Sequence, residues 1–293
     1  MDLKYLITFK TILETGSFIN AARALNYTQS TVTFQIQQLE QELSVQLFEK
    51  IGRKMVITQA GKDVLPFIDA ILQSVEQLMN YGKNLQDITG SLKISMPETL
   101  LTYKMQPVLK AFREAAPGVK LSLQAMNCYA IRDHIINGGA DIGVHYDVGG
   151  YGATVVTERM ASYPMALVAS PALDRSQRDF LSQGQRKSVS IITNDRQSIW
   201  WGIFERYLKE RGIVPDGILE LGSIEAIKRS VMSNLGVAFL PRFVAEEELS
   251  SGALEELETG LLEKKITAIC SYHKNKWITP AMELFIRLLH ESL

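Results

Sequence analysis

The apolar and polar positions of the first sixty residues recur with helical periodicity and predict three short helices. A first helix ends at Gly16, and Ser17 caps a second helix whose apolar positions are small alanines. Asn26 and Tyr27 interrupt this pattern, and Thr28 caps a third helix. The buried face of the third helix has apolar residues spaced four, three and four apart: Val32, Ile36, Leu39 and Leu43. Two short helices joined by a tight turn predict a helix-turn-helix.

The opposite face of the third helix favours contact with DNA. It carries mostly short polar side chains and no acid, which suits base edges in a major groove. By itself this face also fits a solvated surface, but a basic hairpin follows it, with Lys50, Arg53 and Lys54 around a turn at Gly52. Such a hairpin is typical of a wing that contacts phosphates or a minor groove. We predict that bases are contacted by Gln29, Ser30, Thr33, Phe34 and Gln37, and that phosphates are contacted by Thr31, Lys50, Arg53 and Lys54.

A long amphipathic helix is predicted from Thr58 to about Leu85. Its apolar residues alternate spacings of three and four, as in a heptad seam: Leu65, Ile68, Leu72, Val75 and Met79. Pro66 lies near the start of the helix, where a missing N–H is tolerated. The seam can pack on its own domain or on a second copy. Because the DNA module is complete without it, we favour a dimer, which would place two reading helices on a two-fold repeated operator.

From Leu92 onward, short apolar strands alternate with amphipathic helices, a pattern that predicts an α/β domain. Strands are expected at 92–96, 119–125, 140–145, 164–169, 188–193, 217–221, 236–240 and 265–272. Helices are expected to begin near residues 98, 128, 172, 198, 223, 242 and 279. These are more strands than one compact sheet needs, so we expect two small sheets in two lobes, joined near residues 160 and 267, around a cleft.

The predicted organisation is therefore a winged helix-turn-helix, a dimerisation helix with a hinge, and a bilobed effector domain. The predicted boundaries are 1–58, 59–90 and 91–293, with lobe I at 91–161 plus 268–293 and lobe II at 162–267.

Capping or small polar residues follow strands in both lobes, where helix N-termini expose free N–H groups. Each such residue alone can simply cap a helix, but their recurrence predicts a shared cleft for a small anionic or zwitterionic effector. The candidate effector-binding residues are Pro97, Glu98, Thr99, Asn127, Cys128, Thr193, Ser223 and Ile224. His145 follows another strand; it either lines the same cleft or is a satisfied structural histidine, the interpretation we favour.

Composition narrows the function. The net charge is −1, and residues 1–62 hold seven Lys or Arg against five acids, so several copies are needed for tight DNA binding. The four histidines and two cysteines lack metal-ligand spacing, and there is no nucleophile elbow or phosphate-binding glycine loop. We therefore expect no metal, cofactor or catalytic residue, which leaves an enzyme as the least supported class. A redox sensor using Cys128 and Cys270 remains the alternative, although neither has a basic neighbour in sequence.

The sequence also bears on location. It has no N-terminal leader and no apolar run long enough for a membrane span, so we expect a cytoplasmic protein without membrane contact.

The chain resembles the LysR-type transcriptional regulators over essentially its whole length. In the N-terminal part the matching residues are Phe9, Gly16–Phe18, Ala21, Ala22, Leu25, Thr28–Ser30, Val32, Thr33, Ile36, Leu39, Glu40, Leu43, Leu47, Phe48 and Thr58–Gly61. In the remainder they are Glu98–Leu100, Tyr103, Glu220–Ser223, Glu225–Lys228, Leu235–Ala238, Leu240, Pro241, Lys276, Trp277, Pro280 and Ala281.

The resemblance implies an effector domain similar to periplasmic solute-binding proteins. A small metabolite would bind between the lobes, at positions equivalent to Thr99, Cys128, Thr193 and Ser223. It also implies that the partners are double-stranded operator DNA and further copies of the chain, as a homodimer or a dimer of dimers, with RNA polymerase as a further candidate.

Four residues depart from the family pattern. Phe34 stands where Arg, His or Gln is frequent, and Ser44 stands where Gly is frequent. Cys128 and Pro97 replace hydroxyl residues, which implies a less polar effector or more contact through backbone N–H groups.

Overall fold

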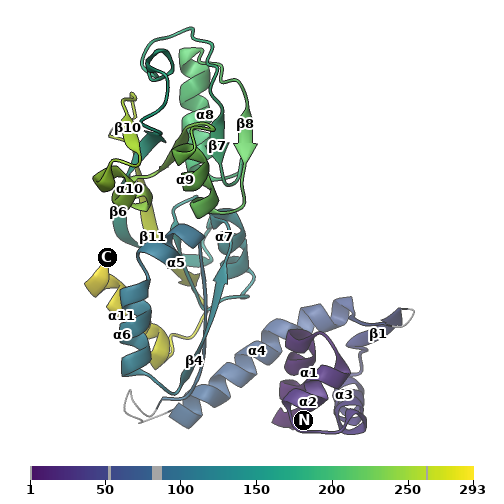
Figure 1. Ribbon diagram of the computed structural model, residues 1–293. Helices are drawn as coiled ribbons and strands as arrows, with labels where there is room; N and C mark the ends of the chain where they lie inside the picture. Colours follow the sequence, from purple (N-terminus) through teal and green to yellow (C-terminus); the bar gives the residue numbers. More distant parts are fainter. Residues whose placement is uncertain (1, 52–53, 81–87, 262) are drawn as a thin grey trace. The chain divides into compact units, whose positions relative to one another are not determined.

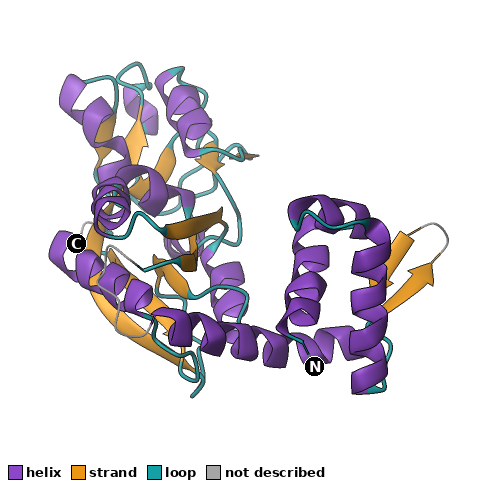
Figure 2. Ribbon diagram, turned by 90° about the horizontal axis from the view of Figure 1, so that it is seen from below, coloured by secondary structure: helices purple, strands orange, loops and turns teal. Residues whose placement is uncertain are grey.

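The computed structural model describes residues 2–51, 54–80, 88–261 and 263–293, and the chain divides into two compact units, 1–83 and 84–293. The first unit contains the predicted three helices, a hairpin and a long helix (Figures 1 and 2). Their bounds are α1 (Leu3–Thr15), α2 (Phe18–Ala24), α3 (Gln29–Leu43), β1 (Phe48–Ile51), β2 (Lys54–Ile57) and α4 (Gln59–Asn80). The rings of Phe9 and Phe18 both pack on Phe48, with centroids 5.5 and 5.2 Å apart. The base of the hairpin is thereby part of the helical core.

Local chemistry fixes the ends of the helix-turn-helix as the sequence predicts. The Ser17 hydroxyl accepts the N–H of Asn20 at 3.1 Å, and the Thr28 hydroxyl accepts the N–H of Thr31 at 3.1 Å. At the C-terminus of α3, Ser44 adopts a φ of 56°, in the left-handed region that favours glycine. This conformation accounts for the frequent glycine at that position of the resembling family.

Two contacts hold the hairpin against the neighbouring helices. One Glu40 carboxylate oxygen accepts the backbone N–H groups of Leu47 at 2.7 Å and Phe48 at 3.1 Å, which joins α3 to β1. A Cβ on Gly61 would lie 2.6 Å from the carbonyl oxygen of Leu47, so α4 approaches the hairpin too closely for a larger residue. The hairpin is therefore positioned by both α3 and α4.

The predicted seam on α4 requires a correction. Ile68 is only 3% exposed, and Leu65 and Leu72 pack against the same core as α1–α3, so these residues do serve an intramolecular core. The premise that the DNA module is complete without this helix is therefore wrong. Val75 is half-buried and Met79 is 65% exposed. The last predicted turns of the helix, beyond residue 80, lie outside the described residues.

The second unit is an α/β domain with two lobes (Figure 1). We call lobe I the part built from β3 (Gly90–Met96), α5 (Glu98–Tyr103), α6 (Gln106–Ala115), β4 (Val119–Ala125), α7 (Cys128–Ile136), β5 (Ile142–Tyr146) and α11 (Pro280–Ser292). Lobe II contains β7 (Ile191–Thr193), α8 (Ile199–Arg211), β8 (Ile218–Glu220), α9 (Ile224–Met232), β9 (Ala238–Pro241), α10 (Glu246–Ser251) and β10 (Glu255–Leu257), with 3₁₀ helices η2 (Arg175–Gln177) and η3 (Arg242–Ala245). The strands β6 (Val155–Ala169) and β11 (Lys265–His273) join the lobes.

The expectation of two separate small sheets is wrong in one respect, because β6 belongs to both lobes. Residues 155–164 of β6 pair antiparallel with β11, whereas residues 165–169 pair with β9 and β10. The resulting seven-stranded sheet has the order β10-β6-β11-β5-β3-β4, with β9 also on β6, and β7-β8 form a parallel pair beside it. The predicted strand at 164–169 therefore begins nine residues earlier than expected.

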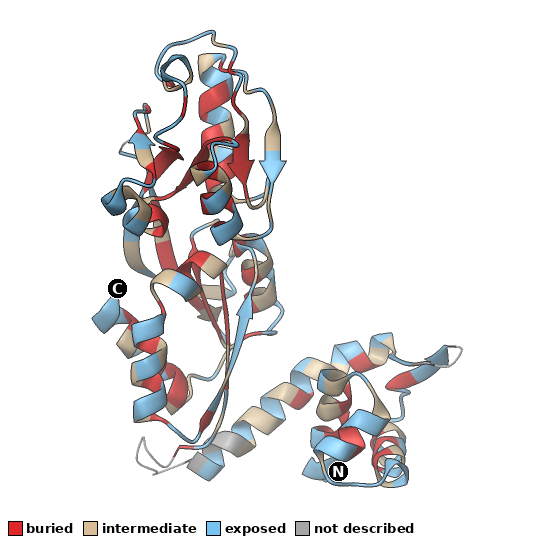
Figure 3. Ribbon diagram, viewed as in Figure 1, coloured by how far each residue is buried: buried red, intermediate tan, exposed pale blue. Residues whose placement is uncertain are grey.

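Three further expectations for this unit differ from the structure. The predicted helix near 172 is replaced by η2 in an irregular segment, where the buried Lys187 ammonium donates to the carbonyl oxygens of Gln177 and Asp179. The predicted strand at 188–193 is limited to β7, and the helix expected near 242 begins as η3 and continues as α10. The sequence analysis did not identify α6 or β10. Buried residues nevertheless fill the interior strands of both lobes (Figure 3).

Candidate functional site

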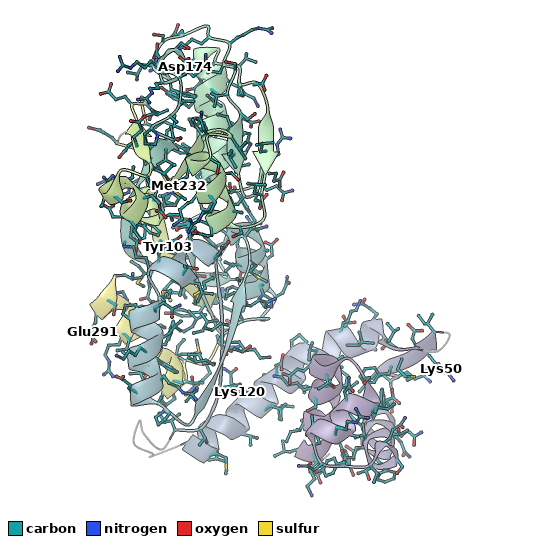
Figure 4. The ribbon with its side chains drawn as sticks, in the orientation of Figure 1. Lys50, Tyr103, Lys120, Asp174, Met232 and Glu291 are labelled. Atoms are coloured by element: carbon teal, nitrogen blue, oxygen red, sulfur yellow. The ribbon has the colours of Figure 1, made fainter. Side chains whose placement is uncertain are left out.

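The first candidate surface is the exposed face of α3 with the adjoining hairpin. Gln29, Ser30, Phe34 and Gln37 are exposed, as predicted for residues that contact bases. Lys50 is exposed on the hairpin (Figure 4). Thr31 and Thr33 are half-buried, whereas Arg53 and the side chain of Lys54 lie outside the described residues.

Hydrogen bonds within α3 engage some of these polar groups. The Thr28 hydroxyl lies 2.8 Å from the hydroxyls of both Ser30 and Thr31, and the Thr33 hydroxyl donates to the carbonyl oxygen of Gln29 at 2.9 Å. The amides of Gln29 and Gln37 project from the exposed face without such local bonds among the described residues. These two amides are therefore the strongest candidates for paired hydrogen bonds to a base.

Phe34 gives this face an apolar centre. It is 55% exposed, although burial of a phenylalanine is favourable by about 2 kcal/mol. Tyr27, at the turn before α3, is 39% exposed. An exposed aromatic ring on a surface that can enter a major groove fits contact with a thymine methyl group.

The second candidate site is a cavity of about 480 Å³ in the second unit, where strands of both lobes end and helices begin. Sixteen described residues line it: Pro97, Glu98, Thr99, Ala125, Met126, Asn127, Cys128, Tyr129, Asn194, Asp195, Ser198, Ile199, Trp200, Glu220, Gly222 and Ile224. They come from the ends of β3, β4, β7 and β8 and from the starts of α5, α7, α8 and α9. This convergence at strand ends is typical of ligand sites in α/β domains.

Six of the eight predicted effector residues line this cavity; Thr193 and Ser223 do not. Their neighbours Asn194, Gly222 and Ile224 do, because the chain turns toward the cavity just after Thr193 and on both sides of Ser223. Sequence reasoning missed Asp195, Ser198, Trp200 and Glu220 among others. Ser198 carries a detectable signal, because its hydroxyl caps α8 by accepting the N–H of Trp201 at 3.3 Å.

The helix starts at the cavity are capped to different degrees. Asn127 accepts the N–H of Ala130 at 2.8 Å, so its carbonyl oxygen is engaged at the start of α7. Ser223 makes no side-chain cap at the start of the nine-residue α9. The first-turn N–H groups of α9 therefore lack a side-chain acceptor, and the positive end of this helix adjoins the cavity through Ile224.

The charge of the cavity bears on the two ligand classes expected from the sequence, an anion or a zwitterion. Its lining contains three acids, Glu98, Asp195 and Glu220, and no Lys, Arg or His. Arg196, next to Asp195, is exposed and lies over the Trp201 ring at 5.8 Å. A purely anionic ligand would be repelled by three carboxylates, so the lining opposes the anionic alternative and leaves the zwitterionic one.

Aromatic and hydroxyl contacts connect the cavity wall to the interior. The Thr99 hydroxyl lies 2.9 Å from the Tyr146 hydroxyl, and both side chains are buried. The Tyr146 ring packs edge-on against Trp200 across the two lobes, with centroids 5.8 Å apart. Trp200 of the cavity wall is thus in direct contact with the interior of lobe I.

The helix α5 carries a second contact between the lobes at its other end. Tyr103, labelled in Figure 4, packs against Phe243 of η3 with centroids 6.1 Å apart. The Lys228 ammonium of α9 lies 5.3 Å from the Tyr103 ring centre and 2.7 Å from a Glu248 carboxylate oxygen. One short helix therefore joins the Glu98 and Thr99 side of the cavity to lobe II.

Both cysteines are buried and free. Burial raises the pKa of the Cys128 thiol to about 12, and it also raises the pKa of the Cys270 thiol well above its ordinary value. Because the thiolate is the reactive form, neither environment activates a cysteine. Cys128 lines the cavity as a small apolar group.

His145 is the structural histidine that the sequence analysis favours. It is fully buried; its Nδ1 lies 2.9 Å from the carbonyl oxygen of Tyr146, and its Nε2 lies 2.9 Å from the Ser271 hydroxyl. Burial lowers the pKa of the imidazole to about 4. The neutral ring joins β5 to β11, and it does not line the cavity.

Two features of the described residues concern membranes and metal ions. No helix there is long and apolar enough to cross a membrane. No group of three or more His, Cys, Asp or Glu side chains in that part of the chain is arranged to hold a metal ion.

Comparison with known proteins covers both units. Residues 3–62 match the family described as bacterial regulatory helix-turn-helix protein, lysR family, and residues 85–293 match the LysR substrate binding domain. The uncharacterized HTH-type transcriptional regulator YfiE of Escherichia coli is 47% identical over 292 residues, covering 100% of this chain and 99% of the relative. The uncharacterized HTH-type transcriptional regulator YwqM of Bacillus subtilis is 32% identical over 299 residues, again covering 100% and 99%. Among solved structures, ArgP of Mycobacterium tuberculosis superposes with a TM-score of 0.74 at 17% identity, covering 100% of this chain and 97% of that one.

Proposed function

The chain belongs to the LysR family of bacterial helix-turn-helix transcriptional regulators, and from this premise we propose how its two sites work together. The first unit recognises a specific operator through α3 and contacts the DNA backbone through the hairpin. A small molecule in the cavity between the lobes changes the affinity or geometry of that contact. The observation that supports this proposal is the cavity itself, which is built from strand ends of both lobes in a chain that also exposes a DNA-reading helix.

Operator contacts are assigned to the exposed side chains of α3. Gln29 and Gln37 offer paired hydrogen bonds to bases, Ser30 and Thr33 offer single ones, and Phe34 offers an apolar contact. Phosphate contacts are assigned to Thr31, Lys50, Arg53 and Lys54.

A homodimer, or a dimer of dimers, is the proposed functional unit. Apolar residues of α4 at spacings of four and seven are exposed: Phe67 (70%), Ile71 (37%) and Leu78 (76%). They lie on one side of the helix, away from the Ile68 side that packs on the unit's own core. We therefore place the dimer contact on this face in place of the Leu65–Leu72 part of the predicted seam.

The cavity is proposed to bind its ligand without catalysis. The described residues that line it include no histidine and a single thiol, Cys128, whose pKa is raised to about 12 by burial. This environment also disfavours the redox alternative, because a sensor cysteine needs an accessible thiolate. RNA polymerase remains a candidate partner on grounds of family alone.

Operator recognition is tested by selecting binding sites from a random duplex library with the full-length protein and then measuring affinity by fluorescence anisotropy. Gln29→Ala and Phe34→Ala should each weaken operator binding about ten-fold and relax the preference at one base position. Binding to random DNA should change little, because phosphate contacts remain.

Gln41→Ala provides the matched control, since Gln41 is exposed on the same helix but lies near its C-terminal end. This variant should bind like the parent protein. If the Gln29 and Phe34 variants keep full affinity and base preference, α3 does not read the operator through these residues.

A further inference from the structure

We infer that the effector is a small molecule with a cationic nitrogen group, such as a basic amino acid or an amine, which pairs with the carboxylates of the cavity. This inference rests on the proposed function and specifies its ligand class. Two observations support it: the acidic side chains that line the cavity, and buried polar atoms beside the cavity that have no hydrogen-bond partner.

The three acidic side chains come from both lobes. Glu98 begins α5 in lobe I, whereas Asp195 and Glu220 follow or end strands β7 and β8 in lobe II. None of the three forms an ion pair with a described residue. Three carboxylates without a basic partner give the cavity a negative lining, which favours a cationic ligand over an anionic one.

The Asp195 side chain is also held in place by a local hydrogen bond. One of its carboxylate oxygens accepts the N–H of Gln197 at 2.7 Å, which fixes the side chain in a local turn. The second oxygen has no hydrogen bond within the described residues. A cation that contacts both lobes would favour their approach, because Glu98 and the lobe II acids would share it.

A separate observation points to a hydrogen-bonding ligand at the lobe II wall. Among the described residues, three buried side-chain polar atoms within residues 193–200 have no hydrogen-bond partner. These atoms are Thr193 Oγ1, Asn194 Oδ1 and Trp200 Nε1. Thr193 is only 3% exposed and Trp200 only 5%. A buried polar atom without a partner destabilises a fold, so such clustering beside a cavity marks a place where a ligand completes the bonding.

The remaining lining suits a ligand with both a charged end and a carbon skeleton. Trp200, Tyr129, Met126 and Ile224 supply apolar and aromatic surface, and aromatic faces attract cations. The uncapped start of α9 offers N–H groups to a carboxylate, so an amino acid fits the wall better than a simple diamine.

The test is a thermal-shift comparison of two compound classes on the full-length protein at equal ionic strength. The cationic class is L-lysine, L-arginine and putrescine, and the acidic class is succinate, 2-oxoglutarate and benzoate. The inference predicts that a member of the first class raises the melting temperature and that the second class has no effect.

The best-binding amine is then titrated by calorimetry into the isosteric variants Glu98→Gln, Asp195→Asn and Glu220→Gln. Each should bind about ten-fold more weakly than the parent protein, because one charge-assisted contact is lost. Glu247→Gln removes a carboxylate outside the cavity that is exposed, as Glu220 is, and should leave the Kd unchanged. Added salt should weaken binding to the parent protein, a result that does not depend on whether any variant folds.

Three outcomes overturn the inference. If an acid stabilises the protein and no amine does, the ligand class is wrong while the cavity remains an effector site. If an amine binds all three amide variants as tightly as the parent, its cation does not contact these carboxylates. If no compound of either class stabilises the chain, the inferred ligand class is wrong, whereas the proposed function is tested independently by the operator selection.

Discussion

Phe34 exposes 55% of its surface on a helix face that is otherwise polar, and Glu98, Asp195 and Glu220 line a cavity without a basic side chain. Both the apolar Phe34 and the three acids are unexpected at these positions, because a polar side chain was expected in the one case and an anion-binding lining was one of the alternatives in the other. Under the proposed function, Phe34 offers an apolar contact where the family frequently has a hydrogen-bonding residue, and such a contact would favour thymine. The sequence predicts an anionic or zwitterionic effector, and the three acids favour the alternative that carries a positive charge.

His145 provides a prediction at the same scale. In the folded protein burial lowers its pKa to about 4, against about 6.5 for an exposed imidazole. Between these values the unfolded chain binds the proton first, so the stabilising effect of the neutral ring is complete above pH 6.5 and is lost as the pH falls toward 4. Arg132 and Asp147 are the charged groups that act on the ring in addition to burial.

We therefore expect the parent protein to lose about 1 kcal/mol more stability than His145→Asn between pH 7.5 and pH 5.5. Denaturant unfolding at both pH values measures this difference, whatever the overall stability of the variant. Equal losses in the two proteins would show that folding does not lower the pKa of His145.

The helix α4 has two apolar faces, one buried in its own unit and one exposed. One face packs on the core of its own unit through Leu65, Ile68 and Leu72. The exposed residues Phe67, Ile71 and Leu78 form a second apolar face, and Figure 3 shows exposed and less exposed residues alternating along the helix. An apolar face of this kind on one helix is suited to the same face of a second copy.

Placing a charge on this second face should separate the copies. We expect Phe67→Asp and Ile71→Asp each to shift the protein toward a smaller species in analytical ultracentrifugation, weakening association about ten-fold or more. Lys62→Asp introduces the same side chain on an exposed position of α4 that points away from the stripe, and its oligomeric state should be unchanged. If the Phe67 and Ile71 variants sediment like the parent, the dimer contact lies elsewhere.

The elements that depend on local signals could be predicted from the sequence. Ser17, Thr28 and Asn127 cap helices in the structure because capping depends on a few neighbouring residues. The length of β6 could not be predicted in this way, since residues 155–164 are ordered by antiparallel pairing with β11, about a hundred residues further along the chain. The segment after Pro171 similarly depends on a residue further along the chain. Its carbonyl oxygens at Gln177 and Asp179 accept hydrogen bonds from the Lys187 ammonium, and the predicted helix does not form there.

The residues of the cavity also divide into those that local sequence signals predict and those that depend on distant contacts. Strand-to-helix corners at Pro97, Asn127 and Ile224 were predictable from strand ends and cap residues, and they do line the cavity. Trp200 and Glu220 were not, because their places in the wall depend on how the two lobes meet. Thr193 is the clearest example of this limit of sequence-based prediction. The strand-to-helix connection that lines the cavity is predicted correctly, but its lining residue is Asn194, one position after Thr193.

The whole molecule joins a DNA-binding unit and a substrate-binding unit in one chain. The cavity lies between two lobes connected by β6, β11 and the contacts of α5, so a ligand that contacts Glu98 and Asp195 together favours one arrangement of the lobes. A ligand can change DNA binding only if it binds the DNA-competent and DNA-incompetent arrangements with different affinities. This coupling is reciprocal for binding free energies.

The most direct measurement is therefore the operator Kd of the full-length protein, determined by fluorescence anisotropy with and without a saturating amount of the amine that stabilises the protein best. Calorimetry of the same amine with and without operator completes the cycle. The account predicts that the amine changes the operator Kd about five-fold or more, and that the operator changes the amine Kd by the same factor. Equal operator affinity, footprint and DNA bending with and without bound amine would contradict the account.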